Sequence, residues 1–305
     1  MNTCKICSEN FESEKSLHMH LRSHKITLAE YYTKYYPRKN LYTGDPLPFK
    51  NKEQYFERDF SNREQLLNWC RENSDEIVRD YILGLLKRRI KSKDLRFGPS
   101  HLELKTSELP TVELFQKHFG SYTRACELAG VKPMFGSRLP DEWQNKVSDD
   151  VKIFIDTREQ QPLEFANSES LKLDFGDYAV GSDHYDYTYV DRKSETDFKS
   201  TLSKNSLERF RAELQRTKDF DSYLFVVTET DMSTMEKRNK WSPHTSNMKY
   251  IYHNMRVLAH DFAGHCQFIF TGGREQSQEI IPKILTLGKK LWNVDLQYYI
   301  SRKLI

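Results

Sequence analysis

The positions of two cysteines and two histidines near the start of the chain limit how its first residues can fold. Cys4 and Cys7 are separated by two residues, and after a gap of twelve residues His20 and His24 stand one helical turn apart. A tight knuckle brings two thiolates together, and two imidazoles on one face of a helix complete a tetrahedron around zinc. Without a bound ion, a segment of about 25 residues has too little apolar surface to fold. The spacing therefore predicts a structural zinc site made by these four residues.

Residues 1–25 resemble a Cys-Cys-His-His zinc finger, a small ββα unit. Phe11 and Leu17 stand where such a finger needs its apolar core. His18 is an alternative ligand, but His20 fits the spacing better. The resemblance implies a structural zinc ion and a DNA-binding module.

A finger helix that begins near Glu14 turns four side chains toward a DNA groove. These positions are Ser13, Lys15, Ser16 and Met19. None of them is an arginine, the side chain best suited to guanine. Phosphate contacts or weak base readout are therefore expected from this finger.

Composition is typical of soluble, folded proteins. A length of 305 residues allows about two domains and one sizeable core. The chain is 37% hydrophobic and 30% charged, which favours solubility, and its 17 Tyr and 18 Phe argue against disorder. We find no apolar run of membrane-span length and no signal-peptide core. Five cysteines with one close pair do not indicate a disulfide framework, so a reducing, intracellular setting is expected.

The net charge of +3 is small, so the distribution of charge is more informative than its sum. Residues 87–96, "KRRIKSKDLR", hold six Lys or Arg against one acid. Such a run is either a solvated helix end or a patch that contacts phosphates. In the second interpretation Arg88, Arg89 and Lys91 are candidate DNA-binding residues.

Residues 26–135 are expected to be mainly helical and to target DNA. Tyrosines between residues 28 and 56 form either a packed cluster or a base-stacking surface. A helix is predicted from Ser61 or Asn62 onward, with a break near Asn73 and Ser74.

Residues 109–133, "LPTVELFQKHFGSYTRACELAGVKP", indicate a helix, a Gly turn, a second helix and a Gly stop. The pattern resembles the FGS helical repeat, here about residues 97–133, found beside nuclease domains in phage and homing endonucleases. Lys117 and Arg124 are its candidate phosphate contacts. Residues 136–150 are polar and predict a linker with one helical turn.

The second half of the chain predicts an α/β fold with a mixed central sheet. Five apolar or alternating runs are expected to form strands: "VKIFID", "LKLDFGDYAVG", "DYTYVDRKSETDF", "SYLFVVTE" and "CQFIFTG". Helices are expected at 206–218, 247–263 and 276–291. The fold is therefore expected to be a sheet flanked by helices.

Three carboxylates stand at the ends or edges of these strands: Asp156, Asp177 and Asp191. Brought together, they repel one another unless a divalent cation neutralises them, and Mg²⁺ or Mn²⁺ prefers oxygen ligands. The alternation Asp191-x-Lys193 places both side chains on one face of a strand, with Arg192 on the other. A lysine beside such a metal stabilises charge that builds on a phosphate. The pattern indicates a phosphodiesterase site.

In this order, "IDTRE", "FGDY" and "VDRKSETDF" resemble the XPF-type nuclease domain, a branch of the restriction-endonuclease-like nucleases, over about residues 150–290. Asp191 stands where the family commonly has glutamate. The resemblance implies Asp156, Asp177 and Asp191 as Mg or Mn ligands and Lys193 as the catalytic lysine. Glu159 and Asp197 would support the site. Arg158, Arg192 and Arg209 would contact DNA or brace the carboxylates.

Two features common in that family, a helix-hairpin-helix tail and a helicase domain, are not found in this sequence. We therefore expect the finger and the helical middle to choose the DNA site. The apolar residues within 276–300 predict either a homodimer interface or simple core.

Three functions are compatible with these patterns. The first is a phage homing-type, metal-dependent DNA endonuclease, which would act in the cytoplasm or nucleoid of a bacterial host. The second is a structure-specific nuclease for flaps or branched DNA. The third is a non-catalytic DNA-binding regulator on a nuclease scaffold, and the presence of Asp156, Asp177, Asp191 and Lys193 argues against it.

Overall fold

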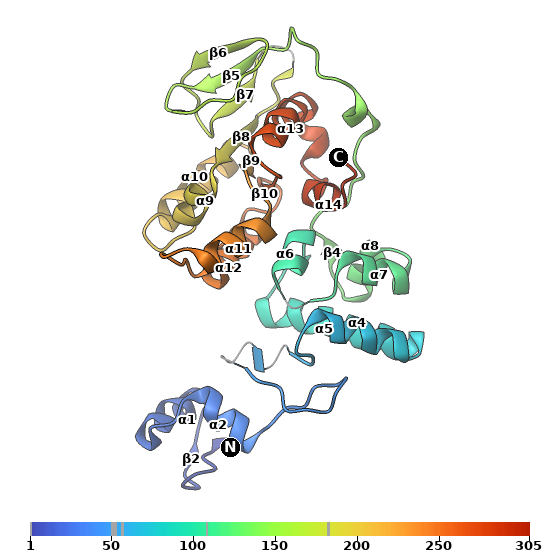
Figure 1. Cartoon of the computed structure of the whole chain (residues 1–305), viewed down its shortest axis with the longest axis vertical. Helices are drawn as coiled ribbons and strands as arrows, with labels where there is room; N and C mark the ends of the chain where they lie inside the picture. The colour runs from blue at the N-terminus through green and yellow to red at the C-terminus, as the bar shows by residue number, and fades with distance from the viewer. Residues whose placement is uncertain (1, 50–53, 56–57, 108, 182–183) are drawn as a thin grey trace. The chain divides into compact units, whose positions relative to one another are not determined.

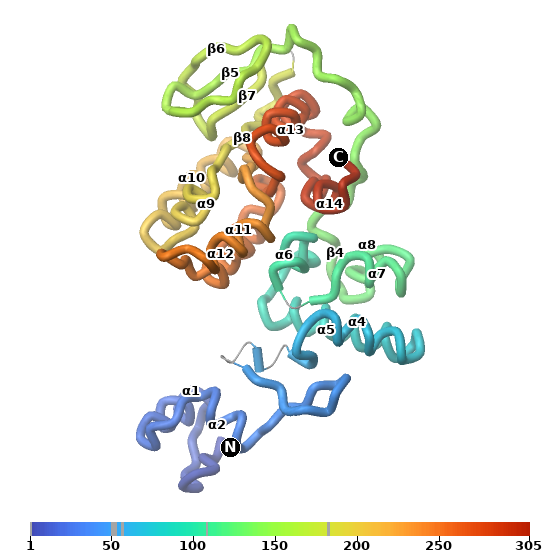
Figure 2. The backbone as a smooth tube through the Cα atoms, viewed as in Figure 1, coloured from blue at the N-terminus to red at the C-terminus, as the bar shows by residue number. Residues whose placement is uncertain are grey.

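The computed structural model describes residues 2–49, 54–55, 58–107, 109–181 and 184–305 (Figures 1 and 2). The chain divides into two compact units. Residues 1–89 and 107–125 form the first, and residues 90–106 and 126–305 form the second. None of the described helices is long and apolar enough to cross a membrane.

The N-terminal segment has the ββα arrangement expected of a finger. Strands β1 (Asn2–Thr3) and β2 (Asn10–Phe11) pair antiparallel and precede helix α1 (Glu14–His20). The side chain of Ser13 caps α1 by accepting the backbone N–H of Ser16. A 3-10 turn, η1 (Leu21–His24), continues the helix to the last expected zinc ligand.

Helix α2 (Leu28–Tyr35) completes the apolar core of the finger. Thr27 and Glu30 form a capping box that starts this helix. The ring of Tyr31 is buried with Leu17 and Leu21, and its hydroxyl accepts the backbone N–H of Lys5 at 2.8 Å. The finger therefore uses a helix beyond residue 25 to bury its own apolar side chains.

Neighbouring tyrosines pack against one another. The ring of Tyr32 lies 5.6 Å from that of Tyr36 and 4.8 Å from that of Tyr55, and Tyr55 also meets Phe49 at 4.7 Å. Tilted and edge-on contacts of this kind are typical of a packed aromatic cluster. Of the two interpretations of these tyrosines, the packed cluster is the one that the described rings show.

Within residues 58–133 the helix break near Asn73 and the turn at Gly120 lie where the sequence predicts them, whereas α6 (His101–Thr106) was not predicted. Helix α4 (Arg63–Glu72) is capped by Asn62, and α5 (Asp75–Lys93) follows after the predicted break. Next come α6, α7 (Val112–Phe119) and α8 (Tyr122–Leu128). Gly120 ends α7 at a φ of 80°, a left-handed conformation that costs glycine least. Strands β3 (Phe97–Gly98) and β4 (Lys132–Pro133) pair parallel.

The second unit is built on a mixed sheet with the strand order β10-β9-β8-β7-β5-β6. The strands are β5 (Ile153–Asp156), β6 (Ser168–Leu171), β7 (Tyr178–Val180), β8 (Thr188–Lys193), β9 (Tyr223–Thr228) and β10 (Cys266–Phe270). Strand β7 runs antiparallel to both β5 and β8, and the remaining pairs are parallel. The sequence predicted five strands. It missed β6 because "SESL" is exposed throughout and has no apolar alternation.

Helices cover both faces of this sheet (Figure 1). One face carries α9 (Glu195–Thr201), α10 (Leu207–Asp219), α11 (Met232–Trp241) and α12 (Met248–Asp261). The other carries α13 (Arg274–Leu287), the turn η4 (Gly288–Leu291) and α14 (Leu296–Ser301). Strand β9 supplies both cores in alternation, Leu224 and Val226 to one and Phe225 and Val227 to the other. Helices α9, α11 and α14 were not predicted.

The apolar residues within 276–300 belong to the core of the second unit. Ile281, Ile284, Leu285 and Leu291 are fully buried, and Trp292 packs against them. Of the two interpretations of this stripe, core is the correct one, because these side chains already face the sheet. The four fully buried side chains are not available for a homodimer interface.

The expected linker at 136–150 contains one 3-10 turn, η2 (Asp141–Gln144). Its Trp143 is buried in the same core, and Lys283 donates to the Trp143 backbone oxygen at 3.0 Å. This segment is therefore anchored on the second unit by an aromatic side chain.

Candidate active site and zinc centre

The four predicted zinc ligands come together in the first unit. The ligand atoms of Cys4, Cys7, His20 and His24 lie within 4.8 Å of one another. Cys7 Sγ is 3.2 Å from His20 Nε2, and Cys4 Sγ is 3.6 Å from His24 Nε2. Two thiolates and two imidazoles are a donor set suited to structural zinc. Among the described residues, no other group of three or more His, Cys, Asp and Glu side chains is this close.

Neighbouring side chains orient the zinc ligands. The Nδ1 atom of His20 faces a carboxylate oxygen of Glu9 at 3.6 Å, which leaves Nε2 for the metal. His18, the alternative ligand, points elsewhere: its Nε2 lies 3.2 Å from the hydroxyl of Tyr32. The contacts of both rings therefore favour His20 over His18 as the ligand.

We predict that the purified chain holds about one zinc ion, because its four ligand atoms within 4.8 Å of one another form a donor set for structural zinc. The double substitution Cys4→Ser, Cys7→Ser should release it, as measured by elemental analysis. Cys70→Ser is the matched control, since Cys70 is buried in the helical region and should leave the zinc content unchanged. Zinc retained by the double variant would place the site elsewhere.

Antiparallel pairing of β7 with β8 brings Asp177 next to Asp191. Asp177 directly precedes β7, and its backbone N–H bonds to the Val190 oxygen at 2.8 Å. The backbone N–H of Arg192 in turn donates to Asp177 Oδ2 at 2.7 Å. Gly176 makes this approach possible: its φ is 60°, and a Cβ atom there would lie 2.6 Å from the Val190 oxygen. The Gly-Asp pair in the sequence thus reflects a steric requirement.

Asp191 and Lys193 share one face of β8, as the alternation predicts. Lys193 Nζ lies 2.7 Å from Asp191 Oδ2 and 3.0 Å from Oδ1. Burial alone would lower the pKa of Lys193, but the negative charges of Asp191 and Asp177 hold it above its ordinary value. The lysine is therefore an ammonium ion fixed beside two carboxyl groups.

Carboxyl groups crowd around Asp177. Burial, and then the negative charge of Asp191, raises the pKa of Asp177 to about 8. Glu213 of α10 also has a raised pKa, first from burial and then from Asp191, and it accepts a hydrogen bond from the backbone of Gly176. The sequence did not single out Glu213, because only the packing of α10 brings it here. A site of this kind repels additional negative charge and attracts a cation.

Asp156 ends β5 beside Asp177, and its backbone N–H bonds to the Asp177 oxygen at 2.8 Å. Its Oδ1 accepts Arg158 Nε at 2.6 Å, and its Oδ2 accepts the backbone N–H of Leu173 at 2.7 Å. Burial opposes ionisation, but these hydrogen bonds hold the pKa of Asp156 below its ordinary value. Both oxygens therefore already have donors. Metal ligation by Asp156 stays a prediction and would require its ion pair with Arg158 to open.

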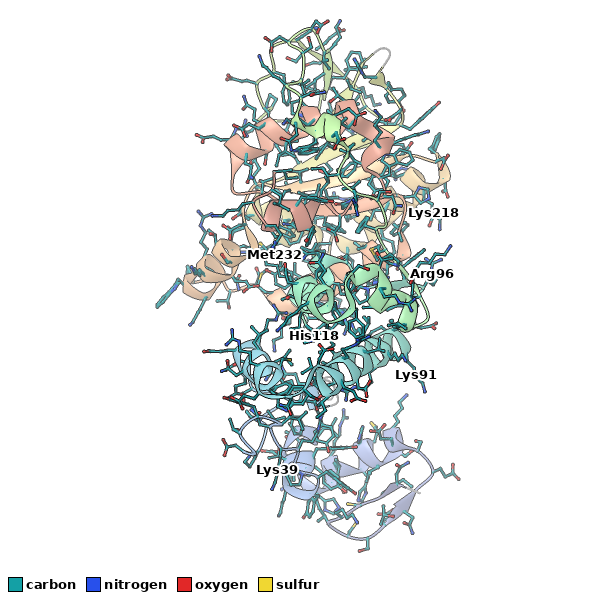
Figure 3. The ribbon with its side chains drawn as sticks, turned by 90° about the vertical axis from the view of Figure 1, so that its right-hand side faces the viewer. Lys39, Lys91, Arg96, His118, Lys218 and Met232 are labelled. Atoms are coloured by element: carbon teal, nitrogen blue, oxygen red, sulfur yellow. The ribbon has the colours of Figure 1, made fainter. Side chains whose placement is uncertain are left out.

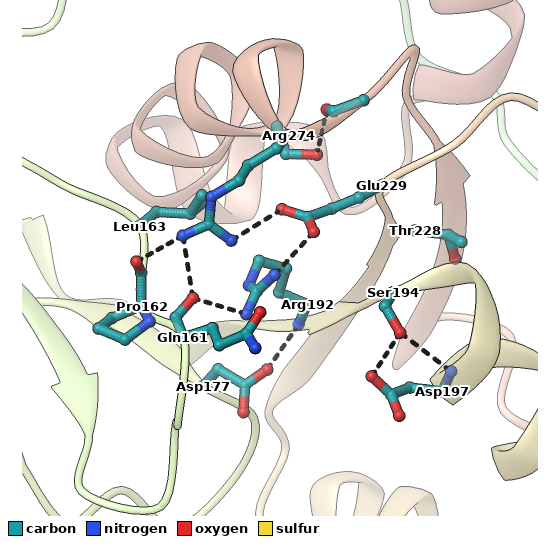
Figure 4. Close-up of polar contacts among 12 residues, drawn as sticks. Gln161, Pro162, Leu163, Asp177, Arg192, Ser194, Asp197, Thr228, Glu229 and Arg274 are labelled. Atoms are coloured by element: carbon teal, nitrogen blue, oxygen red, sulfur yellow. Dashed lines mark hydrogen bonds and ion pairs between the residues drawn. The ribbon is translucent and has the colours of Figure 1, made fainter.

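On the opposite face of β8, Arg192 is the centre of an ion-pair network (Figure 4). Its guanidinium lies 3.0 Å from Glu159 and 2.7 Å from Glu229, and all three side chains are nearly buried. It also donates to the backbone oxygen of Gln161 at 2.8 Å. Arg274 pairs with the other oxygen of Glu229 at 3.6 Å. Arg192 therefore holds the loop after β5 in place. Of the two roles expected for Arg192, a DNA contact or a brace, these contacts favour the brace.

Glu229 was missed in the sequence because it follows an unbroken apolar strand and belongs to no motif there. It comes directly after β9, and its backbone N–H bonds to the Lys193 oxygen at 2.9 Å. This register places it beside Arg192. The only sequence signal available was a single acid at the end of a buried strand.

The remaining predicted site residues are exposed. Asp197 accepts the Ser194 hydroxyl at 2.6 Å at the start of α9 (Figure 4), so its present contact is a helix cap. The side chain of Arg158 is 65% exposed despite its pair with Asp156, and Arg209 is exposed on α10. The two arginines are therefore accessible to a ligand.

Among the predicted DNA-binding cations of α5, Arg89 requires a correction. Its side chain is 5% exposed, within the buried face of the helix, and it cannot reach a phosphate from there. Arg88 is half-exposed and pairs with Asp59 at 2.9 Å, and Lys91 projects into solvent (Figure 3). Lys117 and Arg124 are also exposed. Adjacent residues of a helix point in different directions, so one basic side chain can be buried while its neighbour is exposed. A run of basic residues in the sequence does not show which of them is buried.

A mixed sheet flanked by helices, with Gly-Asp before one strand and Asp-x-Lys at the end of its neighbour, matches the restriction-endonuclease-like fold. Residues 155–284 match the ERCC4 domain family, and residues 3–27 match the C2H2-type zinc finger family. The chain carries an XPF-type nuclease domain behind an N-terminal C2H2-type zinc finger.

Among solved structures, the chain is similar to XPF from Aeropyrum pernix, at 17% identity and a TM-score of 0.35, over 45% of this chain and 66% of that one. It is also similar to XPF from Aeropyrum pernix in complex with DNA, at 18% identity and a TM-score of 0.34, over 46% and 66%. The chain thus spans slightly less than two thirds of those chains. No curated protein sequence matches it.

The ion-pair network predicts a loss of stability on Glu229→Gln. The change leaves Arg192 buried with one fewer countercharge, which should lower the free energy of unfolding by about 2 kcal/mol. Glu279→Gln on α13 is the control, because Glu279 is exposed and should change stability little. Equal midpoints for both variants in chemical denaturation would contradict a bracing role for the network.

Proposed function

We propose that the protein is a metal-dependent DNA endonuclease that hydrolyses phosphodiester bonds beside Asp177, Asp191 and Lys193. The observation that carries the proposal is the crowding of two strand-edge carboxyl groups around a paired lysine, within a domain that matches ERCC4. The finger and the helical region are proposed to choose the DNA site, in the manner of a phage homing enzyme. That type would act inside a bacterial cell, in its cytoplasm or nucleoid.

The donor set fits a divalent cation. Burial, and then the negative charge of Asp191, raises the pKa of Asp177, so a cation bound there would favour its ionised form. Asp177 and Asp191, with Asp156 as a third candidate, would hold Mg²⁺ or Mn²⁺, which prefer carboxylate oxygens. When bound, such an ion supplies Lewis-acid activation of the phosphate and of the attacking water.

The protein's own side chains supply binding and charge stabilisation. The ammonium of Lys193, held by Asp191, is positioned to offset negative charge that grows on the phosphate oxygens. The exposed guanidinium of Arg158 is proposed to contact a phosphate of the substrate, and Arg209 is a second candidate. Glu159 acts at a distance, by holding Arg192 and the loop after β5 in place.

A structure-specific nuclease for flap or branched DNA is the second candidate function, favoured by the ERCC4 match. The zinc finger and the FGS-like pattern favour the homing type instead, since both are modules for choosing a site on duplex DNA. A homodimer stays a prediction, and any interface would have to use residues other than the buried stripe within 276–300.

We predict that Asp177→Asn, Asp191→Asn and Lys193→Ala each lower the single-turnover cleavage rate at least about a hundredfold, near 3 kcal/mol of transition-state stabilisation. DNA affinity should stay close to wild type, because removing a carboxylate relieves repulsion of a polyanion. Asp191→Glu should retain measurable activity, since it keeps the charge and ligand type. Ca²⁺ should support binding without cleavage.

Asp174→Asn is the matched control for Asp177→Asn, since Asp174 is exposed three residues earlier. Its rate should equal that of the wild type. Full cleavage by Asp177→Asn or Lys193→Ala would show that the chemistry occurs elsewhere. The rates are to be measured with Mg²⁺ or Mn²⁺ on duplex, flap, fork and random-library DNA, which also separates the homing from the structure-specific alternative.

The exposed cations of α5 are proposed to contact DNA phosphates without reading sequence. Replacing Arg88 and Lys91 with Gln should reduce the slope of log affinity against log salt by up to about two phosphate equivalents. Arg89→Gln alone should leave the slope unchanged, because this side chain is buried. Binding titrations at several salt concentrations measure the slope, and an unchanged slope in the double variant would remove this helix end from the DNA interface.

A further inference from the structure

A polar pocket of about 530 Å³ lies in the second unit between α9, α11 and residues 242–246. None of the proposed metal ligands lines it. Its walls carry three basic side chains, Lys199, Arg238 and His244, one acid, Glu195, and five serine or threonine side chains. No Phe, Tyr, Trp or aliphatic residue is among them. The pocket therefore offers many hydrogen-bond donors, and its planar groups are the His244 imidazole and the Arg238 guanidinium.

One carboxylate holds the two permanent cations of this pocket. Glu195 Oε1 lies 2.6 Å from Lys199 Nζ, and its Oε2 lies 3.3 Å from Arg238 Nη1. Lys199 and Glu195 are largely buried, whereas the side chain of Arg238 is 66% exposed. Two cations against one carboxylate leave one positive charge in excess. The arrangement keeps both cations close together without neutralising them.

The outer wall of the pocket is fixed to the rest of the unit. The buried side chain of Asn239 donates to the Ser246 oxygen at 3.0 Å and accepts the Ser246 backbone N–H at 2.9 Å. Ser242 also accepts the backbone N–H of His244 at 3.1 Å. These bonds give residues 242–246 a defined conformation, so the hydroxyls and His244 face a preformed space.

We propose that this pocket binds the sugar-phosphate portion of one DNA strand. Arginine and lysine together with hydroxyl donors recognise phosphate oxygens, and the remaining hydroxyls suit a deoxyribose. The volume exceeds that of a phosphate group alone. Because α9 begins two residues after Lys193, the pocket belongs to the segment that carries the proposed chemistry. A strand seated there is held at a fixed point relative to the scissile phosphate.

The phosphate has two possible sources, an internal phosphodiester of a continuous strand or a terminal 5′-phosphate. The inference extends the proposed DNA endonuclease function, since it identifies a second contact with the same substrate. Binding in the pocket is nevertheless measurable without cleavage. If the pocket does not bind DNA, the proposed cleavage reaction is not affected. If the protein does not cleave DNA, binding in the pocket can still be measured.

The test measures binding of two trinucleotides, with and without a 5′-phosphate, to the full-length protein by calorimetry with no added divalent cation. Lys199→Gln and Arg238→Gln should each weaken binding about tenfold, the loss expected for one charge-assisted hydrogen bond. Lys237→Gln is the matched control: Lys237 is exposed on the same helix, does not line the pocket, and should not change affinity.

Each result decides the inference. Weakening confined to the 5′-phosphorylated trinucleotide assigns the pocket to a strand terminus, and equal weakening for both assigns it to the continuous backbone. Affinities that do not respond to Lys199→Gln and Arg238→Gln, or that respond equally to Lys237→Gln, overturn the proposal. Thermal melting of each variant checks that the unit stays folded.

Discussion

The antiparallel pairing of β7 with β8 is the constraint on which the candidate active site depends. It places the residue before one strand beside the last residues of the other, so Asp177 meets Asp191 and Lys193 although 13 residues separate the two aspartates. The pairing needs a residue without a Cβ at position 176, where the backbone of Val190 passes closely. Burial, together with repulsion from the charge of Asp191, disfavours the ionised form of Asp177. A cation or a proton relieves that repulsion.

The two faces of strand β8 have different roles: one carries the proposed catalytic side chains, and the other carries an ion-pair network that stabilises the site. Asp191 and Lys193 lie on one face, and Arg192 on the other joins Glu159 and Glu229. Because strand side chains alternate, the two sets cannot exchange roles without changing the register of the sheet. The pairing of β8 with its neighbouring strands therefore fixes the positions of the charged groups on both faces. The ion pairs of Arg192 keep the loop after β5 at the same edge of the sheet as the carboxyl groups.

The zinc finger illustrates how a small module obtains a core. Its zinc ligands order the knuckle and one helix, but the apolar side chains of that helix are buried only when Tyr31 from α2 packs against them. The contacts of Tyr31 and Tyr32 cover part of the helix and leave Lys15, Ser16 and Met19 exposed. The exposed positions are those that the finger geometry turns toward DNA, so the packing of α2 is compatible with a DNA-facing role.

The sequence by itself determined features that depend on short spacings: the zinc ligands, the shared face of Asp191 and Lys193, the helix break before Asp75 and the turn at Gly120. Each follows from local geometry, since a helical turn or a strand alternation fixes where neighbouring side chains point. Tertiary structure alone decided the burial of Arg89, the partners of Asp156, the approach of Glu213 and Glu229, and the use of the stripe within 276–300 as core. These outcomes depend on which distant segments pack together. No local pattern encodes that choice, because burial and ion pairing are set by the free energy of the whole packed unit.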